Sequence, residues 1–327
     1  MKYSLYKLEF TTAIHIGDDS GMSSLDSSEM AVHADTLFSA LCLEALQSGG
    51  QELLSQFSAE VRGGKLLLSD ALPYDEEEYY LPKPVLAANQ RKESSGSHNK
   101  KKFKDLKYIP VSQFSAYLKN LQSGSESFDP ESINKSFGNY ETYTRAAIKG
   151  LEETKPYHIG VFRFIKGCGL YIIAAYSEDK QNQLLYRLLT SLSYSGLGGK
   201  RTSGLGKFKI AEVNSISEES SQPALKTFYH LLTAGDAPYQ MAISVSLPKD
   251  EELEQAAAMA SYSLVRRGGF VQSSDYADTP LKKRVIYMFS PGSCFAHRFE
   301  GDIYDVAHYG RHPVYRYGKP MFMGVKL

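Results

Sequence analysis

The first ten residues alternate between apolar and polar side chains, which predicts a half-buried strand over Tyr3–Phe10. Two later stretches, Thr36–Gln47 and Asp179–Leu192, space their apolar residues as an amphipathic helix does. The second of these helices carries a leucine stripe made of Leu184, Leu185, Leu188, Leu189 and Leu192. Further strands are expected at Lys65–Ser69, Tyr157–Ile165, Leu170–Tyr176 and Lys207–Val213.

The order of these elements is that of a ferredoxin-like or RNA-recognition-motif unit. Residues 1–214 would form this unit, with a long insertion at about 71–154 between its halves. A connector over 215–236, holding a helical turn or two, leads to a second unit at 237–327. That unit would contain a strand from Tyr239, a helix at 251–261, and strands near 264–271, 284–289 and 320–326. We therefore expect an α+β protein of two ferredoxin-like βαββαβ domains, related as a diverged repeat.

Charge is balanced over the whole chain but unevenly distributed along it. Lys plus Arg and Asp plus Glu both number 37, so no global attraction to polyanions is expected. Arg91–Lys107 carries seven cations against two acids, and Tyr262–Leu327 carries ten against five. Asp70–Glu78 carries five acids and is interpreted as a solvated face or loop. The first basic stretch fits either a mobile linker or an arm laid against nucleic acid, and both interpretations stay open.

The three cysteines lie far apart and form no C-x-x-C pair, so neither a disulfide framework nor a zinc site is expected. No run of about 18 apolar residues occurs, and the chain begins directly with its first strand. The expectation is a reduced, soluble, cytoplasmic protein.

A glycine-rich stretch from Gly196 to Phe208 is the most informative segment, with five glycines in the eleven residues 196–206. Glycine permits positive φ and a close approach to a bulky ligand, and the cations and hydroxyls between the glycines suit phosphate oxygens. A P-loop is excluded because Arg201 follows Gly199-Lys200. A dinucleotide fingerprint is excluded because the stretch follows a helix and precedes a strand. A polyanion cradle is therefore predicted, and a flexible hairpin with incidental charge is the alternative.

Taken together, several segments resemble the RAMP superfamily of CRISPR-associated proteins, and within it the fourth Csm subunit of type III-A effector complexes. The segments that carry the resemblance are Val32–Leu41, Tyr143–Ile148, the glycine stretch, Val265–Val271, Gly292–Phe295 and His312–Gly318.

The resemblance implies a non-catalytic subunit that holds the repeat-derived 5′ tag of the crRNA. It also implies two protein partners, the large polymerase-like subunit and the backbone RAMP subunits. A thumb-like hairpin is expected as well, and the basic insertion after Pro84 is its candidate here. No cofactor, metal, small-molecule substrate or membrane is implied.

The first candidates for RNA contact lie in the glycine stretch. Lys200 and Arg201 are expected to bind phosphates, and a solvated turn is the alternative. The remaining candidates in this stretch complete the site through hydroxyls and backbone N–H groups; they are Gly198, Gly199, Thr202, Ser203 and Gly204.

Further candidates lie elsewhere in the chain. Arg266 and Arg267 are adjacent on a strand and point to opposite faces, so one would touch RNA while the other pairs with an acid. Phe270 would either stack on a base or pack in the core. Arg145 matches a position where the family carries an RNA-facing arginine, and an ion pair with the acidic run is the alternative.

Two histidines are the last candidates. His15 lies where RNA-processing relatives keep a catalytic histidine, and it is kept as an RNA contact. The competing function is a metal-independent RAMP endoribonuclease that processes precursor crRNA with His15 as general acid or base. His33 and Asp35 form an H-x-D pattern, for which helix capping is the simpler explanation than a metal site.

Overall fold

A computed structural model describes residues 1–17, 25–86, 105–123, 129–147, 154–273 and 275–327. The helices are α1 (Ala34–Arg62), α3 (Phe114–Ser123), α4 (Pro130–Ile133), α5 (Asp179–Ser195), α6 (Pro223–Thr233) and α7 (Leu253–Ala257). The strands of the first half are β1 (Lys2–Phe10), β2 (Leu66–Leu68), β3 (Leu72–Asp75), β4 (Glu78–Pro82), β5 (Tyr108–Pro110), β6 (Gly138–Ala147), β7 (Lys155–Phe164), β8 (Cys168–Tyr176) and β9 (Phe208–Ile216). Those of the second half are β10 (Tyr239–Ala242), β11 (Leu264–Arg267), β12 (Ile286–Phe289), β13 (Cys294–Phe295), β14 (Ile303–Asp305), β15 (Tyr315–Tyr317) and β16 (Phe322–Val325).

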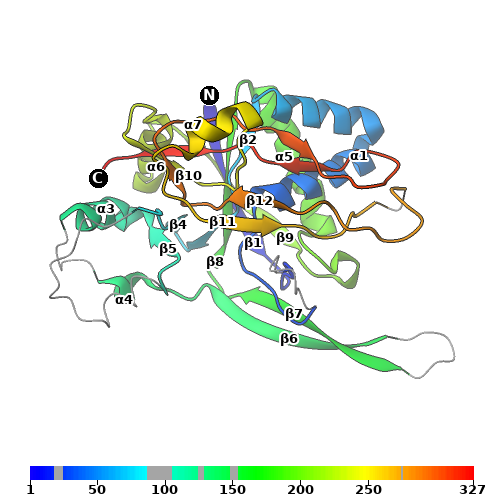
Figure 1. Ribbon diagram of the computed structural model, residues 1–327. Helices are drawn as coiled ribbons and strands as arrows, with labels where there is room; N and C mark the ends of the chain where they lie inside the picture. Colours follow the sequence, from blue (N-terminus) through cyan, green and yellow to red (C-terminus); the bar gives the residue numbers. More distant parts are fainter. Residues whose placement is uncertain (18–24, 87–104, 124–128, 148–153, 274) are drawn as a thin grey trace.

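An antiparallel sheet of seven strands forms the centre of the molecule (Figure 1). Strand β1 lies between β8 and β9, and β8 also pairs with β2 and β3. Helices α1 and α5 pack on one face of this sheet, where the predicted leucine stripe of α5 is buried. On the other face, α6 buries Phe228 against Tyr79 and Tyr171. The fold is therefore mixed α and β with antiparallel sheets, as the sequence predicted.

Three sequence interpretations need correction. The acidic run is only partly a solvated loop: Glu76 and Glu77 form an exposed turn, but the residues on either side belong to β3 and β4 of the central sheet, and Asp70 is buried. The connector over 215–236 is not largely irregular, since β9 extends to Ile216 and α6 is an 11-residue packed helix. The first helix extends well past Gln47 to Arg62, across a break at Gly49 and Gly50.

A long hairpin of β6 and β7 leaves the body of the molecule at its lower edge (Figure 1). The sequence placed β7 in the central sheet, yet it pairs with β6 along its whole length and joins the body through an Ile14–Phe162 bridge. The thumb candidate after Pro84 falls largely on residues 87–104, which lie outside the described ranges. The projecting hairpin that the structure describes is β6–β7.

The second half distributes its strands over small sheets, one of three strands in the order β13-β10-β16 and two of two strands. Its last strand, β16, is buried. All three cysteines are free thiols. Among the described residues, no helix is long and apolar enough to cross a membrane.

Candidate nucleic-acid interface

The glycine stretch links the end of α5 to the start of β9, as predicted, and folds over the segment that follows β1. The Gly199 N–H donates to the His15 carbonyl at 2.7 Å, and the Gly206 N–H donates to the Ala13 carbonyl at 2.8 Å. A Cβ at Gly198 would lie 2.6 Å from the His15 carbonyl oxygen, and φ there is +98°. Glycine is therefore required at Gly198 both by its backbone conformation and by its close contact.

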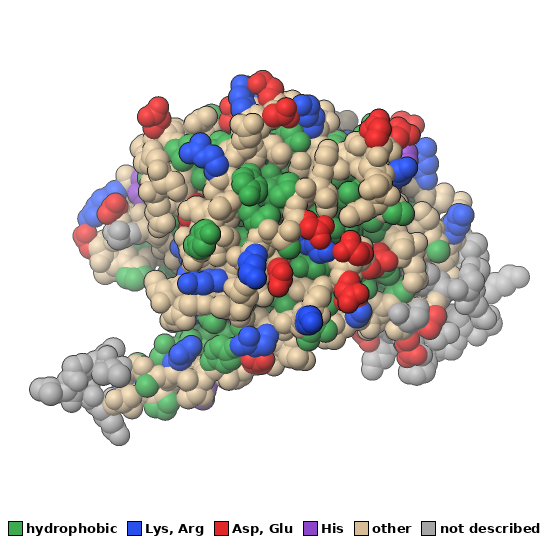
Figure 2. All heavy atoms as spheres, turned by 180° about the vertical axis from the view of Figure 1, so that it is seen from behind, with side chains coloured by type: hydrophobic (Ala, Val, Ile, Leu, Met, Phe, Trp, Pro, Cys, Tyr) green, Lys and Arg blue, Asp and Glu red, His purple; other side chains and the backbone are tan. Residues whose placement is uncertain are grey.

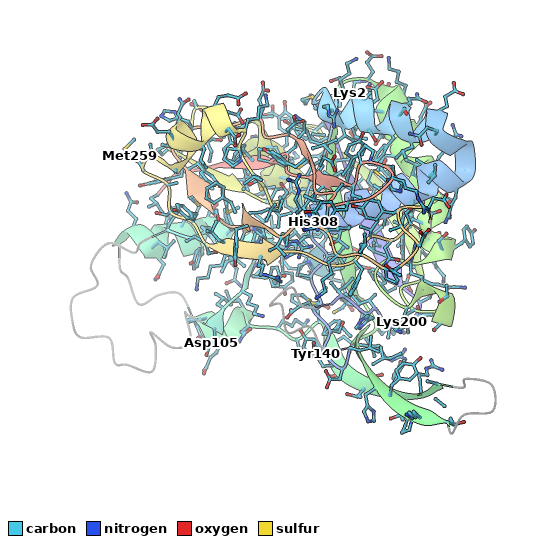
Figure 3. The ribbon with its side chains drawn as sticks, turned by 45° about the vertical axis from the view of Figure 1, so that its right-hand side comes forward. Lys2, Asp105, Tyr140, Lys200, Met259 and His308 are labelled. Carbon is cyan, nitrogen blue, oxygen red and sulfur yellow. The ribbon has the colours of Figure 1, made fainter. Side chains whose placement is uncertain are left out.

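The outer part of the stretch contains a short 3₁₀ turn at Arg201–Ser203, flanked by Lys200 and Gly204. We call the five residues 200–204 the crest. Lys200 adopts the left-handed conformation, and its ammonium lies 5.4 Å from the ring centroid of Tyr157 on β7. Thr202 and Ser203 are exposed. Figure 3 places Lys200 between the body and the β6–β7 hairpin. The crest thus faces the hairpin.

Arg201 turns the other way, toward helix α1. Its Nη1 lies 3.7 Å from Oε1 of Glu44, whose side chain is only 1% exposed. The second oxygen of Glu44 accepts a hydrogen bond from Ser191 on α5 at 2.6 Å. A buried carboxylate requires such partners. Arg201 is consequently oriented by α1 before any ligand binds.

A hollow of about 340 Å³ opens beside the crest, and we call it the RNA hollow after the ligand that the sequence predicts for this stretch. Its walls come from the glycine stretch, the first turns of α1, the segment after β11 and the strand β15. Predicted site residues that line it are His15, Gly198, Gly199, Arg201, Arg267 and Phe270. The structure therefore brings together six predicted residues from three separate parts of the sequence.

Arg267 is a buried structural cation. Its Nε and Nη2 bond to the two carboxylate oxygens of Asp35 at 3.0 and 2.9 Å, and Nη2 also donates to Thr36. Arg316 bonds to the same carboxylate and donates to the Gly268 carbonyl at 2.7 Å. Burial alone would raise the pKa of Asp35, but the guanidiniums of Arg267 and Arg316 hold it below its ordinary value. The expectation that one residue of the Arg266–Arg267 pair meets an acid is thus correct for Arg267.

Asp35 is not the helix cap that the sequence suggested. The capping position is His33, which makes no capping bond through its side chain, and Asp35 lies in the first turn of α1. The Ala34 N–H donates instead to Asp70 Oδ1 at 2.8 Å. The same oxygen of Asp70 accepts from the Val245 N–H at 2.9 Å.

Phe270 is 51% exposed and lines the hollow, so it is not a core residue. The Lys282 ammonium lies 5.6 Å from its ring centroid. Arg266, on the opposite face of β11, lies outside the hollow, with its guanidinium near Gly268. Arg145 is exposed on β6 and lies 5.9 Å over the ring of Tyr143, away from the hollow.

His15 is buried beside the crest. Its Nδ1 lies 2.6 Å from the Gly160 carbonyl oxygen, so Nδ1 carries the proton of this hydrogen bond. The other side of its ring packs against Gly199. In the part of the chain that the structure describes, no three His, Cys, Asp or Glu side chains gather into a metal-binding group.

Sequence reasoning missed two cations of the hollow, Lys283 and Arg316. Arg316 lies in one of the segments that carried the family resemblance, so that segment was the available signal. The concentration of cations in the hollow does not extend over the whole surface. On the face seen in Figure 2, side chains of both signs are scattered among apolar ones, consistent with the chain's zero net charge.

Comparisons with known proteins identify the family of the chain. The family model described as "CRISPR Csm4 C-terminal domain" matches residues 235–325, and the model described as "RAMP superfamily" matches residues 7–209. The "CRISPR system Cms protein Csm4" of Mycobacterium tuberculosis is 40% identical, covering 99% of this chain and 98% of the relative. The Streptococcus thermophilus protein of the same name is 32% identical over 100% of both chains.

Among solved structures, a chain of a Csm3-Csm4 subcomplex of a type III-A interference complex superposes with a TM-score of 0.65 at 19% identity. That match covers 99% of both chains. A chain of a Csm1-Csm4 cassette superposes with a TM-score of 0.61 at 17% identity, covering 100% of this chain and 99% of the other. These two likenesses show a shared fold.

Proposed function

Because the chain belongs to the Csm4 family of the RAMP superfamily, we propose that it holds the repeat-derived 5′ tag of crRNA in a type III-A Csm complex. One observation carries the proposal: the glycine stretch, α1 and the turn after β11 all line the same open hollow. The described residues that line the hollow include four cations and one carboxylate. The cations are Arg201, Arg267, Lys283 and Arg316, and the carboxylate is Asp35. Such local positive charge suits a phosphate chain.

Each group has a distinct part in this proposal. Lys200 and Arg201 contact phosphates, and the exposed hydroxyls of Thr202 and Ser203 add donors at the crest. Phe270 offers an exposed ring for stacking on a base. Arg267 acts indirectly, since its guanidinium is committed to Asp35 and shapes the wall of the hollow.

The projecting β6–β7 hairpin is the better candidate for the thumb that the family resemblance implies. Its outer half passes beside the crest, where Lys200 meets Tyr157, and the exposed Arg145 on β6 is the strand partner of Tyr157. The hairpin would therefore continue the path of an RNA strand that leaves the crest.

Bridging of Csm1 and Csm3 is part of the same proposal. It is supported by relatives of the same fold that were crystallised with Csm3 in one case and with Csm1 in the other. The finer prediction of two ferredoxin-like units is retained. Its support is a matching strand order. The first strand of the first half, β1, lies between β8 and the last strand, β9. The first strand of the second half, β10, lies between β13 and the last strand, β16.

We propose that the subunit does not cleave RNA. His15 would have to serve as acid or base, yet its Nδ1 is committed to the Gly160 carbonyl and its ring is packed under Gly199. An endoribonuclease also needs a second proton-transfer group at the scissile phosphate.

The experiment is a salt titration of binding to a crRNA that carries its 5′ tag. Lys200→Ala with Arg201→Ala should weaken binding and flatten the plot of log affinity against log salt by about one unit per lost phosphate contact. The control, Lys226→Ala with Lys326→Ala, removes the same charge from exposed positions outside the hollow and crest. An unchanged slope in the crest variant would show that the crest does not hold the tag.

A further inference from the structure

A second hollow, of about 570 Å³, lies at the opposite end of β1 from the RNA hollow. We call it the distal pocket. Met1 and Tyr3 at the start of β1 contribute to its wall, whereas His15, beyond the end of β1, lines the RNA hollow. The nine residues of β1 span roughly 27 Å at the usual rise per residue of a strand. Figure 3 shows the same separation, with Lys2 at the top of the molecule and Lys200 near its lower edge.

Lys319 is a buried cation in this pocket. The residue is only 4% exposed, and its Nζ donates to the Gly301 carbonyl at 3.2 Å. An ammonium has three N–H donors. No carboxylate forms an ion pair with Lys319 within the described ranges, and burial lowers the pKa of its ammonium. Asp302, Glu300 and Glu252 act on this ammonium through space and raise its pKa, but none of them pairs with it directly. A buried cation without a direct ion-pair partner is costly, so an anion that reaches Nζ would be stabilised.

Arg298 supplies a second cation that is held by neutral groups. Its Nε donates to Gln240 Oε1 at 2.6 Å, and its Nη2 donates to the Leu232 carbonyl at 3.4 Å. Its guanidinium carbon lies 6.0 Å from the ring centroid of Phe322. These contacts fix the guanidinium at the pocket while leaving its charge uncompensated by a carboxylate among the described residues.

The remaining charges of the wall are already engaged. Arg62 lies 3.8 Å from Asp302, and the acid Glu300 pairs with Lys249 at 2.7 Å. The wall thus keeps an excess of positive charge.

Aromatic side chains form much of the rest of the wall. Phe299 and Phe322 are buried, and Tyr3 is half-buried beside them. Small-molecule sites have volumes of this size and combine apolar walls with a few fixed polar groups. We propose that the distal pocket binds a small aromatic phosphate of mononucleotide size. Its phosphate would lie against Lys319 and Arg298, and its ring against Phe299 and Phe322.

The test uses AMP as the probe and adenosine as its uncharged match, with binding measured by isothermal titration on the full chain. AMP should bind at least tenfold more tightly than adenosine. At ten times its dissociation constant, AMP should raise the Tm by roughly 2 °C. Arg298→Gln and Lys319→Met should each weaken AMP binding at least tenfold, while Lys200→Ala with Arg201→Ala should leave it unchanged.

Lys319→Met also separates ligand binding from a structural role. If the ammonium serves a ligand, replacing it with an apolar chain of similar length should keep or raise the Tm of the free protein. If Lys319→Met does not fold, the AMP affinity of Arg298→Gln alone tests the proposal. The proposal is overturned if AMP and adenosine bind equally, or if AMP binds only where Lys200 and Arg201 are intact. It is also overturned if AMP does not bind and the pocket instead takes an acidic side chain of a partner subunit.

Discussion

Replacing Asp35 with Asn tests the buried ion cluster that closes one wall of the RNA hollow. The Asp35 side chain is 1% exposed and receives the guanidiniums of Arg267 and Arg316, whose side chains are 9% and 5% exposed. Asn keeps the size of Asp but removes the charge and turns one acceptor into a donor that faces a guanidinium. Removing one partner from a buried ion cluster leaves the others uncompensated, which costs about 3–5 kcal/mol.

The assay is equilibrium unfolding in urea, followed by circular dichroism, with Tm as a second measure. A loss of about 3–5 kcal/mol should lower the Tm by roughly 4–7 °C for a chain of this size. The chain has 23 tyrosines and no tryptophan, so tyrosine fluorescence provides an independent signal. Asp179→Asn is the matched control, because Asp179 pairs with Lys2 on the surface and both side chains are more than half exposed. Its unfolding should match that of the wild type.

The pH dependence of the same variant gives a sign that can be checked. The folded-state pKa of Asp35 lies below its unfolded value of about 3.8, so its contribution to stability is present above that pH. The contribution is lost as the pH falls below about 4 toward the folded-state pKa. The stability gap between wild type and Asp35→Asn should therefore stay constant from pH 5 to 7 and shrink in more acid solution.

A third variant distinguishes charge pairing from packing. Asp35→Leu combined with Arg267→Met and Arg316→Met replaces the whole cluster with apolar side chains, and it should recover much of the lost stability. Tag RNA should nevertheless bind more weakly than to the wild type, because the variant removes two cations but only one carboxylate from the wall of the hollow. An Asp35→Asn variant within 1 kcal/mol of the wild type would refute the reasoning, because it would mean that solvent already compensates both guanidiniums.

Three further outcomes follow from the site. Gly198→Ala should lower Tm more than Gly204→Ala, because both positions have positive φ but only Gly198 has backbone within 3 Å of the added Cβ; equal effects would contradict the close contact with His15. Phe270→Ala should weaken RNA binding by about 1–3 kcal/mol without changing the salt slope, and a change confined to the slope would argue against stacking. Incubation with repeat RNA in EDTA should give no cleavage by wild type or His15→Ala, and cleavage lost only in the variant would establish an endoribonuclease.

The local features of the fold were predictable because neighbouring residues determine them. Alternation predicted β1, the leucine stripe predicted α5, and the glycine spacing predicted the loop between α5 and β9. The length of helix α6 was underestimated because Pro223 and the serines before it resemble a connector, although Leu225, Phe228 and Leu232 form an apolar face. The strands on either side of the exposed Glu76–Glu77 turn were missed because the acids obscure the alternation, although Tyr74 in β3 and Tyr79 in β4 are both buried.

The site could be predicted only in part because its decisive contacts span the chain. Lys200 and Arg201 are recognisable from their glycine neighbours. The partners of Asp35 lie 232 and 281 residues away, and no local pattern connects them. An acid near the start of a helix is most simply a cap, so local reasoning favoured the wrong role. Only the tertiary fold shows that this carboxylate binds two arginines of the second half of the chain.

Two buried acids of the first half, Asp35 and Asp70, both reach into the second half. Asp35 holds Arg267 and Arg316, and Asp70 accepts from the Val245 N–H at 2.9 Å. The wall of the RNA hollow is built from the same contacts, because Asp35, Arg267 and Arg316 line it. Docking of the two halves and formation of the hollow are therefore one structural event. A ligand that binds only the closed hollow must then stabilise the junction between the halves as well, by an amount set by its affinity and concentration. Tag RNA should accordingly protect amide hydrogens at Val245 from exchange, although Val245 does not line the hollow.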